Sequence, residues 1–511
     1  MLWRMRPTST AQNADMALEW MEGTLGWGSI VLFVLLLLYF APGRRPHNFP
    51  PGLPMLPLVG SLIHMRGAPT RTKLRSLHKK YGNVAGFGMF GTGVVLVSSV
   101  PLIKKFFAIN EVAGRPPSVL TTTRNLLLSE GVTTNLGILG GDGPRWQVQR
   151  RFVLRHLRDL GFGKTSNEAL MMDEVTELID YIKQRKGTPM PMKRLFNRSV
   201  VNVLWGMVMG KRYSYDNAKL TKVIDTFIQP ADINLIHPIF SIPGIMRAII
   251  YIPVLKEKLK PIINLIHFIK DELRDFMANE DLRKNFSLVS TYLKEVESRD
   301  NDPNFDMNQM AAVTLEMFGA GMDTTTTTLT MGMYLLSKYQ AVQQKLQQEL
   351  DDVVGRDRLP SFHDMDRLPY TQATIHEMQR KANLVAIIIH ASLGDFTFEG
   401  YHIPKGSLIL ANMEDAMLNP KLWKNPYEFD PENFLDDKGN FVKNEAFMPF
   451  GTGKRICIAE TLVRKELFFL IACLLHRFTF TVDNEDALPD NEYTFSAAVN
   501  FSAIGHPRSP L

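Results

Sequence analysis

A cysteine in a glycine-broken loop is the residue best suited to chemistry in this sequence. The run from Phe450 to Glu460 reads FGTGKRICIAE, and its Cys457 is one of only two cysteines in the chain. Two cysteines are too few for a disulfide framework or a cysteine-rich zinc site. Gly451 and Gly453 allow a tight backbone that residues with a Cβ would resist. The loop is therefore a candidate for a close approach to a bound group.

The residues after Cys457 predict a strongly apolar helix from Ile458 to Leu475. A helix start offers unpaired N–H groups and a positive dipole end, and both favour a thiolate. Such a thiolate could be a nucleophile or an axial iron ligand. The alternative is a buried structural cysteine, which is the commoner role of a single cysteine taken alone.

This loop resembles the heme-binding loop of the cytochrome P-450 family, whose pattern is Phe-x-x-Gly-x-Arg-x-Cys-x-Gly/Ala. The matching residues are Phe450, Gly453, Arg455, Cys457 and Ala459. The resemblance runs from about residue 48 to about residue 505. It implies a mainly α fold with a small β-rich lobe, and heme b with the Cys457 thiolate as its metal ligand. It also implies O2 as oxidant and electrons from NADPH through a reductase.

A threonine-rich segment lies earlier, from Ala320 through Asp323 and Thr324 to Thr328. Five β-branched residues in a row are poor helix formers. The segment is similar to the family's Ala/Gly-Gly-x-Asp/Glu-Thr motif. That similarity implies that Ala320 lies against the heme, that Thr324 holds water or dioxygen, and that Asp323 relays protons from solvent. The alternative is a core helix whose threonine hydroxyls bond back to the preceding turn.

Other matches concern the charge of the cofactor. Trp146 and Arg150 fit the family's Trp-x-x-x-Arg, and His390 lies where microsomal members have a propionate-binding histidine. Propionates are anions that arginine and protonated histidine bind. The resemblance thus implies Asp323 and Thr324 as catalytic residues, and the following cofactor-binding set: Trp146, Arg150, Ala320, His390, Phe450, Gly451, Gly453, Arg455 and Cys457.

Glu377 and Arg380 match the family's Glu-x-x-Arg, which we assign to structure around the heme. At this spacing the two side chains meet on one helix face, and a buried pair needs further hydrogen-bond partners. The family's third partner lies in Pro-Glu-Arg-Phe, where this chain has Asn433 in place of arginine. Asparagine can donate a hydrogen bond but brings no charge, so we expect a weaker lock.

The N-terminal part predicts a membrane anchor. Residues 25–41 are uncharged and apolar, at the short end for a span, and Arg44 and Arg45 follow them. We therefore expect residues 1–24 in the lumen and a catalytic domain, 61–511, on the cytosolic side of the endoplasmic reticulum. Residues 42–60 are similar to the family's proline-rich hinge.

A second interpretation of the N-terminus starts from Arg4 and Arg6, which occur in the first twelve residues without an acidic residue. This composition would fit a short mitochondrial transit peptide. It is the weaker interpretation, because transit peptides are not followed by a spanning segment.

The remaining chain alternates between helical and strand-like patterns. We expect a strand meander at 81–99, a loop-rich stretch at 112–143, mostly helix at 145–294, helices at 307–339, 341–354 and 368–381, and short strands after 391 with a turn at 400–406. Residues 233–254 are unusually apolar and broken by prolines. They predict either a buried helix pair or a substrate entrance that dips into the bilayer.

Charge indicates the kind of partner. The formal net charge of +6 comes without a dense basic block, so we expect no nucleic acid. Four arginines crowd one predicted helix, with Lys454 nearby in the cysteine loop: Arg150, Arg151, Arg155 and Arg158. This helix is either a solvated face or a docking surface for an acidic electron donor, such as NADPH-cytochrome reductase or cytochrome b5.

The resemblance is closest to the microsomal drug- and steroid-oxidising branch of animals. It implies a monooxygenase that hydroxylates or epoxidises a lipophilic molecule, such as a steroid, terpenoid, fatty acid or xenobiotic. The apolar residues expected to face the substrate are Phe318, Leu384, Val385, Ile388 and Val499. A heme-thiolate isomerase or dehydratase and a non-catalytic membrane heme carrier are the alternatives.

Overall fold

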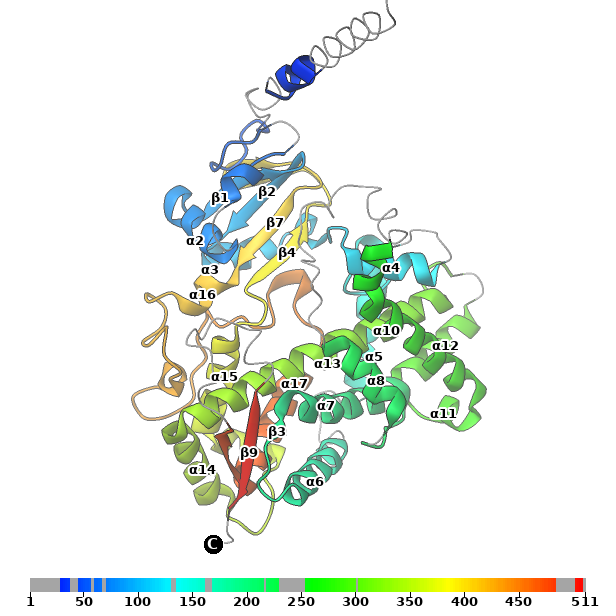
Figure 1. Cartoon of the computed structure of the whole chain (residues 1–511), viewed down its shortest axis with the longest axis vertical. Coiled ribbons are helices and arrows are strands. Elements are labelled where there is room, and N and C mark those ends of the chain that lie inside the picture. The colour runs from blue at the N-terminus through cyan, green and yellow to red at the C-terminus, as the bar shows by residue number, and fades with distance from the viewer. Residues whose placement is uncertain are drawn as a thin grey trace, which may run out of the picture.

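The structure is a computed structural model, and part of the chain is described in it. The described residues are 28–36, 45–56, 59–66, 70–129, 135–160, 168–215, 217–228, 253–299, 302–483 and 501–508. The predicted architecture is confirmed: the body is mainly helical, and a smaller lobe carries a mixed sheet (Figure 1).

One long helix, α13 (Met307–Lys338), crosses the helical body (Figure 1). Its start is fixed by Asp306, whose side chain accepts the N–H of Gln309 at 2.8 Å. The helix packs closely along α7 (Met192–Met209) and is almost wholly buried from Thr325 to Ser337. The predicted helix at 307–339 is thus confirmed, and it forms the centre of the core.

The helix α17 (Glu460–Arg477) packs against α13 and against α6 (Glu168–Gln184). Its residues from Glu466 to His476 are all buried, which explains a composition that is apolar all round. The predicted helix from Ile458 to Leu475 is therefore present but shifted by two residues. It begins later because Cys457 and Ile458 still belong to the preceding loop.

The β-rich lobe contains a four-stranded sheet in the order β1-β2-β7-β4. The hairpin β1 (Val84–Met89) and β2 (Thr92–Val97) confirms the predicted meander, and β2 pairs in parallel with β7 (Leu408–Asn412). The strand β4 (Ile387–Ala391) runs antiparallel to β7, with His390 opposite Ile409. This pairing places His390 at the edge of the sheet nearest the helical body.

The other elements complete the two lobes. The helices are α2 (Thr70–Tyr81), α3 (Val100–Phe107), α4 (Val119–Leu128), α5 (Gly143–Asp159), α8 (Ala218–Ile228), α10 (Pro253–Ala278), α11 (Glu280–Lys284), α12 (Leu288–Ser298), α14 (Gln340–Val354), α15 (Pro369–Ala382) and α16 (Met413–Leu418). The short strands are β3 (Met190–Pro191), β5 (Phe396–Phe398), β6 (Tyr401–Ile403), β8 (Phe478–Val482) and β9 (Ser502–Pro507). The predicted helices at 341–354 and 368–381 are confirmed as α14 and α15.

Two local predictions were incomplete. The stretch 112–143 contains α4, which a capping box between Ser118 and Thr121 begins despite the preceding prolines. The expected turn at 400–406 contains β6, which pairs with β5 across a tight turn at Gly400. In both places a short regular element is stabilised by a neighbour or a cap that composition alone does not reveal.

The N-terminal residues 28–36 form a helix with exposed apolar side chains, which projects from the β-rich lobe (Figure 1). In the part of the chain that the structure describes, no helix is both long and apolar enough to cross a bilayer. The rest of the predicted anchor at 25–41 lies outside the described residues, as does nearly all of the apolar segment 233–254.

The proline-rich segment after the predicted anchor is fastened to the sheet. Arg45 donates hydrogen bonds to the carbonyls of Pro50 and Leu53, the latter at 2.8 Å. The N–H of Gly86 in β1 donates to the carbonyl of Pro51 at 2.7 Å, and Phe49 is buried. The described part of the segment is non-helical, as predicted, and it packs on the β-rich lobe.

Candidate active site

The cysteine loop is a tight turn that ends against α3. Gly451 and Gly453 have φ of +76° and +74°, and a Cβ on Gly453 would lie 2.0 Å from the carbonyl oxygen of Phe107. Glycine is therefore required at Gly453. The N–H of Cys457 donates to the carbonyl of Phe450 at 3.0 Å, which closes the loop. The side chain of Cys457 is exposed, whereas Cys473 is buried in α17.

The electrostatics of Cys457 differ from the expectation. Although the Cys457 side chain is open to solvent, the protein packed around its sulfur desolvates it and raises the pKa of Cys457, while the N–H groups of Ala459 and Glu460 and the guanidinium of Arg150 act to lower this pKa. The predicted N–H contribution is real, but burial outweighs it because α17 begins three residues after the cysteine. The loop therefore favours a thiol until a cation binds to the sulfur, since metal binding deprotonates cysteine.

Arg455 is held between three loops. Its guanidinium donates to the carbonyls of Ala113 at 2.8 Å, Ile138 at 2.9 Å and Gly141 at 2.6 Å. It also lies over the ring of Trp146, 3.7 Å from the ring centroid. Burial, and then the charge of Arg115, lower the pKa of Arg455 to about 9.

The helix α5 brings Trp146 and Arg150 to the same place. Arg150 donates to the carbonyl of Ile456 at 2.6 Å, and its guanidinium lies 6.0 Å from the Trp146 ring centroid. The indole N–H of Trp146 is buried and has no hydrogen-bond partner in the structure. A buried donor without a partner costs free energy, so this position favours a bound acceptor.

His390 reaches the same cluster from β4. Its ring stacks on Phe107 with centroids 4.3 Å apart, and its Nδ1 lies 2.8 Å from the carbonyl of Val112, to which it donates. Burial, followed by the charges of Arg115 and Arg455, lowers the pKa of His390 to about 3. The histidine is therefore neutral at pH 7 and not the cation expected. Arg115 and Arg455, the two arginines that lower its pKa, lie close enough to His390 to neutralise an anion bound beside it.

Arg115 is a member of this cluster that the sequence analysis missed. It donates to the carbonyl of Ile389 at 2.8 Å, and its Nε is buried without a hydrogen-bond partner in the structure. Burial lowers the pKa of Arg115 to about 10, against the charge of Glu316, and Arg150 adds to the lowering. The only sequence signal is an arginine between Gly114 and Pro116, which is common in surface turns.

These side chains together form an anion site. Three guanidiniums repel one another, and two N–H donors lack partners, those of Trp146 and Arg115. Carboxylates that accept hydrogen bonds from these N–H groups would offset both the repulsion between the guanidiniums and the free-energy cost of the unpartnered donors, because charge-assisted hydrogen bonds to arginine are strong. The two propionates of a heme fit this donor set, next to an exposed cysteine.

The threonine-rich segment is helical, as the long central helix requires. The hydroxyl of Thr324 donates to the carbonyl of Ala320 at 2.7 Å, and that of Thr328 donates to the carbonyl of Thr324 at 2.8 Å. Back-bonding to the preceding turn is thus present. Yet Ala320 and Thr324 are exposed, although the neighbouring turns of α13 are buried. The segment therefore combines a back-bonded helix with one open face.

Asp323 has a partner that the sequence did not indicate. The Nζ of Lys193, at the start of α7, lies 3.5 Å from its Oδ1. The lysine side chain is nearly buried, at 11% exposure, while the Asp323 side chain is 42% exposed. The carboxylate thus contacts both an interior cation and solvent. Lys193 is 130 residues away in sequence, so no local pattern could have identified the pair.

The predicted Glu377–Arg380 pair is completely buried. Arg380 donates from Nε to Oε2 of Glu377 at 2.7 Å and from Nη2 to Oε1 at 2.6 Å, and it also donates to four backbone carbonyls: Met417, Asn425, Pro426 and Glu428. The Nδ2 of Asn433 donates to Glu377 at 3.3 Å. Asn433 therefore takes the position of the third partner, with a long hydrogen bond and no charge.

One residue expected to face the substrate does not do so. Phe318 is fully buried, with its ring centroid 4.8 Å from that of Trp205 and 5.5 Å from that of Phe268. It lies on the side of α13 that packs against α7 and α10. The prediction failed because α13 is apolar on two faces, and the sequence does not reveal which face is open. Val499 lies outside the described residues.

The other apolar candidates lie at the connection from α15 to β4. Val385 is 47% exposed, and Leu384 and Ile388 are partly buried. Ile388 borders the cysteine loop, because a Cβ on Gly451 would lie 3.2 Å from its Cδ1. Ile388 is therefore in place to line a space beside the loop.

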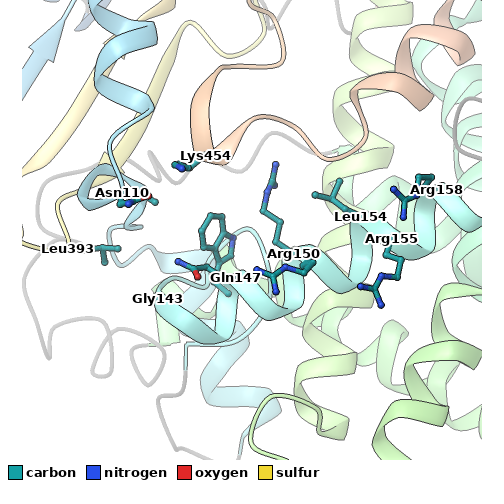
Figure 2. A pocket seen from close by; sticks show the side chains of 12 residues that line it. Asn110, Gly143, Gln147, Arg150, Leu154, Arg155, Arg158, Leu393 and Lys454 are labelled. Atoms are coloured by element: carbon teal, nitrogen blue, oxygen red, sulfur yellow. The ribbon is translucent and has the colours of Figure 1, made fainter.

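A basic groove of about 810 Å³ opens on the surface beside Cys457's loop. Figure 2 shows side chains from α5 along one side, with Lys454 opposite them and Asn110 and Leu393 at one end. The predicted basic residues line it: Arg150, Arg151, Arg155, Arg158 and Lys454. The structure therefore brings the expected cations together in one concave surface.

Comparison with known proteins agrees with this geometry. The family model described as cytochrome P450 matches residues 50–503. Cytochrome P450 2D15 of Canis lupus familiaris is 32% identical over 93% of this chain and 96% of its own length. Cytochrome P450 2L1 of Panulirus argus is 34% identical over 87% and 91%, and cytochrome P450 2J2 of Homo sapiens is 32% identical over 92% and 93%. The chain belongs to the cytochrome P450 family of heme-thiolate monooxygenases, which use O2 and electrons from a redox partner.

Proposed function

We propose that this protein inserts one oxygen atom of O2 into a neutral lipophilic small molecule, with heme b ligated by Cys457. The observation that carries this proposal is the exposed cysteine beside a partly buried cluster of cations with unpartnered donors. When bound, a heme with a thiolate ligand supplies the reductive activation of O2. The remaining work, which is binding, orientation and proton delivery, falls to side chains of this chain.

The residues present fit the cofactor. Trp146, Arg150 and Arg455, with Arg115 added by the structure, would bind the propionates. His390 would donate from Nε2 there once an anion raises its pKa and the ring is protonated. The loop residues Phe450, Gly451 and Gly453 would contact the cofactor, because the missing side chains of the glycines let the backbone approach. Ala320, on the open face of α13, would also contact it.

Proton delivery is proposed for Asp323 and Thr324. The Thr324 hydroxyl now donates to the carbonyl of Ala320, so a water held at this position would take the place of that bond. Asp323 contacts solvent on one side and Lys193 on the other, which suits a carboxylate that passes protons inward. An isomerase or dehydratase would not need this pair, and we therefore favour the monooxygenase.

The substrate is proposed to be uncharged. The apolar residue Ile388 lies beside the cysteine loop, Val385 is exposed on the connection that leads to it, and Ala320 is a small exposed residue of α13. The one acidic residue a turn before Ala320, Glu316, is buried and neutralised by Arg124. This surface favours a steroid, terpenoid, fatty acid chain or xenobiotic over a cationic molecule.

The basic groove is proposed to receive the electron donor. Its five cations would attract an acidic flavoprotein such as NADPH-cytochrome reductase, with cytochrome b5 as a second donor. We also propose that residues 25–41 anchor the protein in the endoplasmic reticulum, with 1–24 lumenal, 42–60 as connector and 61–511 as the cytosolic catalytic domain. The exposed apolar helix at 28–36 supports this arrangement.

Ligation by Cys457 can be tested by spectroscopy. The reduced, carbon-monoxide-bound protein is expected to show the red-shifted Soret band of thiolate ligation. Cys457→Ser should lose this band, because a hydroxyl does not replace the thiolate. Cys473→Ala is the matched control and should retain the band, since this buried cysteine contacts only the carbonyl of Pro360 among its hydrogen-bond partners in the described structure. Retention of the band in Cys457→Ser would reject the assignment.

A further inference from the structure

Glu316 occupies a position on α13 that the proposed chemistry does not use. It precedes Ala320 by four residues and Thr324 by eight, so all three lie on one face of the helix. Unlike the other two, it is buried, with 8% of its side chain exposed. A buried carboxylate needs hydrogen-bond or ion-pair partners, and the identity of these partners indicates the role of Glu316.

The carboxylate is saturated by a single loop and one arginine. Its oxygens accept the N–H groups of Ile138, Leu139 and Gly140, the last two at 2.8 and 3.1 Å, and the guanidinium of Arg124. Arg124 also donates to the carbonyl of Leu136 at 2.5 Å. The loop 136–141 is thus fastened to α13 by a charged clamp.

A second side chain of α13 reinforces the clamp. The Oε1 of Gln309, which is completely buried, accepts the N–H of Gly137 at 3.0 Å. Gly137 has φ of +81°, and a Cβ there would lie 2.3 Å from Oε1 of Glu316. The loop therefore sits so close to α13 that only glycine fits at this position.

The opposite edge of the same loop binds Arg455. The backbone N–H groups of the loop point to Glu316, whereas the loop carbonyls of Ile138 and Gly141 accept hydrogen bonds from Arg455 at 2.9 and 2.6 Å. Arg455 lies two residues before Cys457 and over the ring of Trp146. A continuous set of hydrogen bonds thus joins α13 to the cysteine loop through residues 136–141.

We infer that Glu316 is a positioning residue for the cofactor: by holding loop 136–141 it fixes Arg455, and through Arg455 the site for the heme carboxylates. This inference rests on the proposed heme site. It also assigns loop 136–141 as a fixed wall of the active site between the central helix and the cysteine loop. A counter-ion role toward a cationic substrate is the competing assignment. The four donors already on its carboxylate argue against it.

The test measures heme release from the holoprotein to an apomyoglobin scavenger, alongside thermal unfolding of the same samples. Glu316→Gln keeps the shape of the side chain but loses the charge and one acceptor oxygen. We expect heme release to be faster by about tenfold, which corresponds to one charge-assisted hydrogen bond. Gly137→Ala retains the carboxylate and pushes the loop away from it, so we expect the same direction of change.

Glu272→Gln is the matched control for general stability. Glu272 is equally buried, in α10, and pairs with Lys211 and Lys219, the latter at 2.9 Å. We expect this variant to lower the unfolding temperature and leave heme release unchanged. If Glu316→Gln behaves in the same way as Glu272→Gln, Glu316 only stabilises the fold and the inference is wrong.

A double-mutant cycle with Arg455→Lys shows whether Glu316 affects heme binding through Arg455 or independently of it. If Glu316 acts through Arg455, adding Glu316→Gln to Arg455→Lys should cost little further heme affinity. Additive effects would overturn the inference, as would a change confined to the binding of basic amines. A wild-type protein that takes up no heme would instead reject the proposed function, so the two failures are distinguishable.

Discussion

Thr324 is both hydrogen-bonded within its helix and open to solvent. Its hydroxyl bonds back to Ala320, as in many threonine-containing helices, and its side chain is also exposed on the open face of α13. The hydroxyl of Thr328, four residues later, donates to the Thr324 carbonyl. Because it is engaged there, we do not expect it to replace the Thr324 hydroxyl. The back-bonded interpretation made from sequence is confirmed, and proton delivery by Thr324 stays a prediction.

Replacement of this hydroxyl gives a prediction at the residue scale. Thr324→Ala should retain heme and substrate binding but lower product formed per NADPH by about 10²-fold, within the range of positioned proton transfer. Reducing equivalents should appear as hydrogen peroxide. Thr330→Ala, a buried threonine that donates to the carbonyl of Thr326 at 2.7 Å, is the control. Equal product yield in the two variants would contradict proton delivery by Thr324.

At the scale of the element, α17 contains a buried acid in its apolar core. Glu466 is 3% exposed, and its Oε1 has no hydrogen-bond partner in the structure. Burial, and then the carboxylate of Glu174 in α6, raise the pKa of Glu466 to about 8. Glu466 is therefore neutral in the folded protein at pH 7 and ionised in the unfolded chain.

The sign of the pH dependence follows from proton binding. Between about pH 4.5 and pH 8 the folded state holds a proton that the unfolded state has lost, so the free energy of unfolding decreases as pH rises. Glu466→Gln removes this dependence. We expect the variant to unfold at a higher temperature than wild type at pH 8.5 and at a similar temperature at pH 5, as measured by far-ultraviolet circular dichroism.

The control is Glu257→Gln, an exposed residue of α10 with 69% of its side chain accessible. It should leave the pH profile of unfolding unchanged. A Glu466→Gln profile parallel to that of wild type across pH 5 to 8.5 would mean that Glu466 is already ionised in the fold.

The helix α5 presents the basic groove, and its charges give a second prediction at this scale (Figure 2). Arg155→Glu should slow reduction by the flavoprotein, and the difference from wild type should shrink at high salt, because long-range attraction is screened. The heme spectrum should not change. Lys284→Glu in α11 is an exposed control, with 72% accessibility, and should reduce normally. Similar rates in both variants would place the donor elsewhere.

For the whole molecule, the orientation of the chain in the membrane can be tested through glycosylation. Three sequons occur, at Asn197, Asn285 and Asn500, and Asn500 lies outside the described residues. Asn197 is 1% exposed inside α7 and would be inaccessible in either orientation, whereas Asn285 lies on the surface. A cytosolic catalytic domain predicts an unmodified Asn285 in protein made with microsomes.

A positive control comes from the segment before the predicted anchor. Asp15→Thr would make Asn13 an acceptor, and a lumenal N-terminus predicts an endoglycosidase-sensitive increase in mass for this variant. Glycan on Asn285, with none on Asn13, would reverse the proposed orientation.

The family, the cysteine loop, the central helix and the Glu377–Arg380 lock could all be predicted from the order of residues alone. Each of these depends on residues within one turn or one loop, so their spacing is set by the local backbone. Trp146 with Arg150 belongs to the same class. The chemistry is therefore encoded in short motifs, and their order along the chain positions the main elements.

The tertiary structure decided what depends on contacts between distant segments. Arg115 joins the cluster only because the loop before α4 contacts β4. Lys193 pairs with Asp323 only because α7 packs on α13. Burial likewise reversed two expectations, by keeping His390 neutral and by raising the pKa of Cys457. Phe318 faces the core because the packing of α7 and α10 selects one of two apolar helix faces. Desolvation and long-range pairing arise only when the chain is folded, and a local pattern of residue types does not contain them.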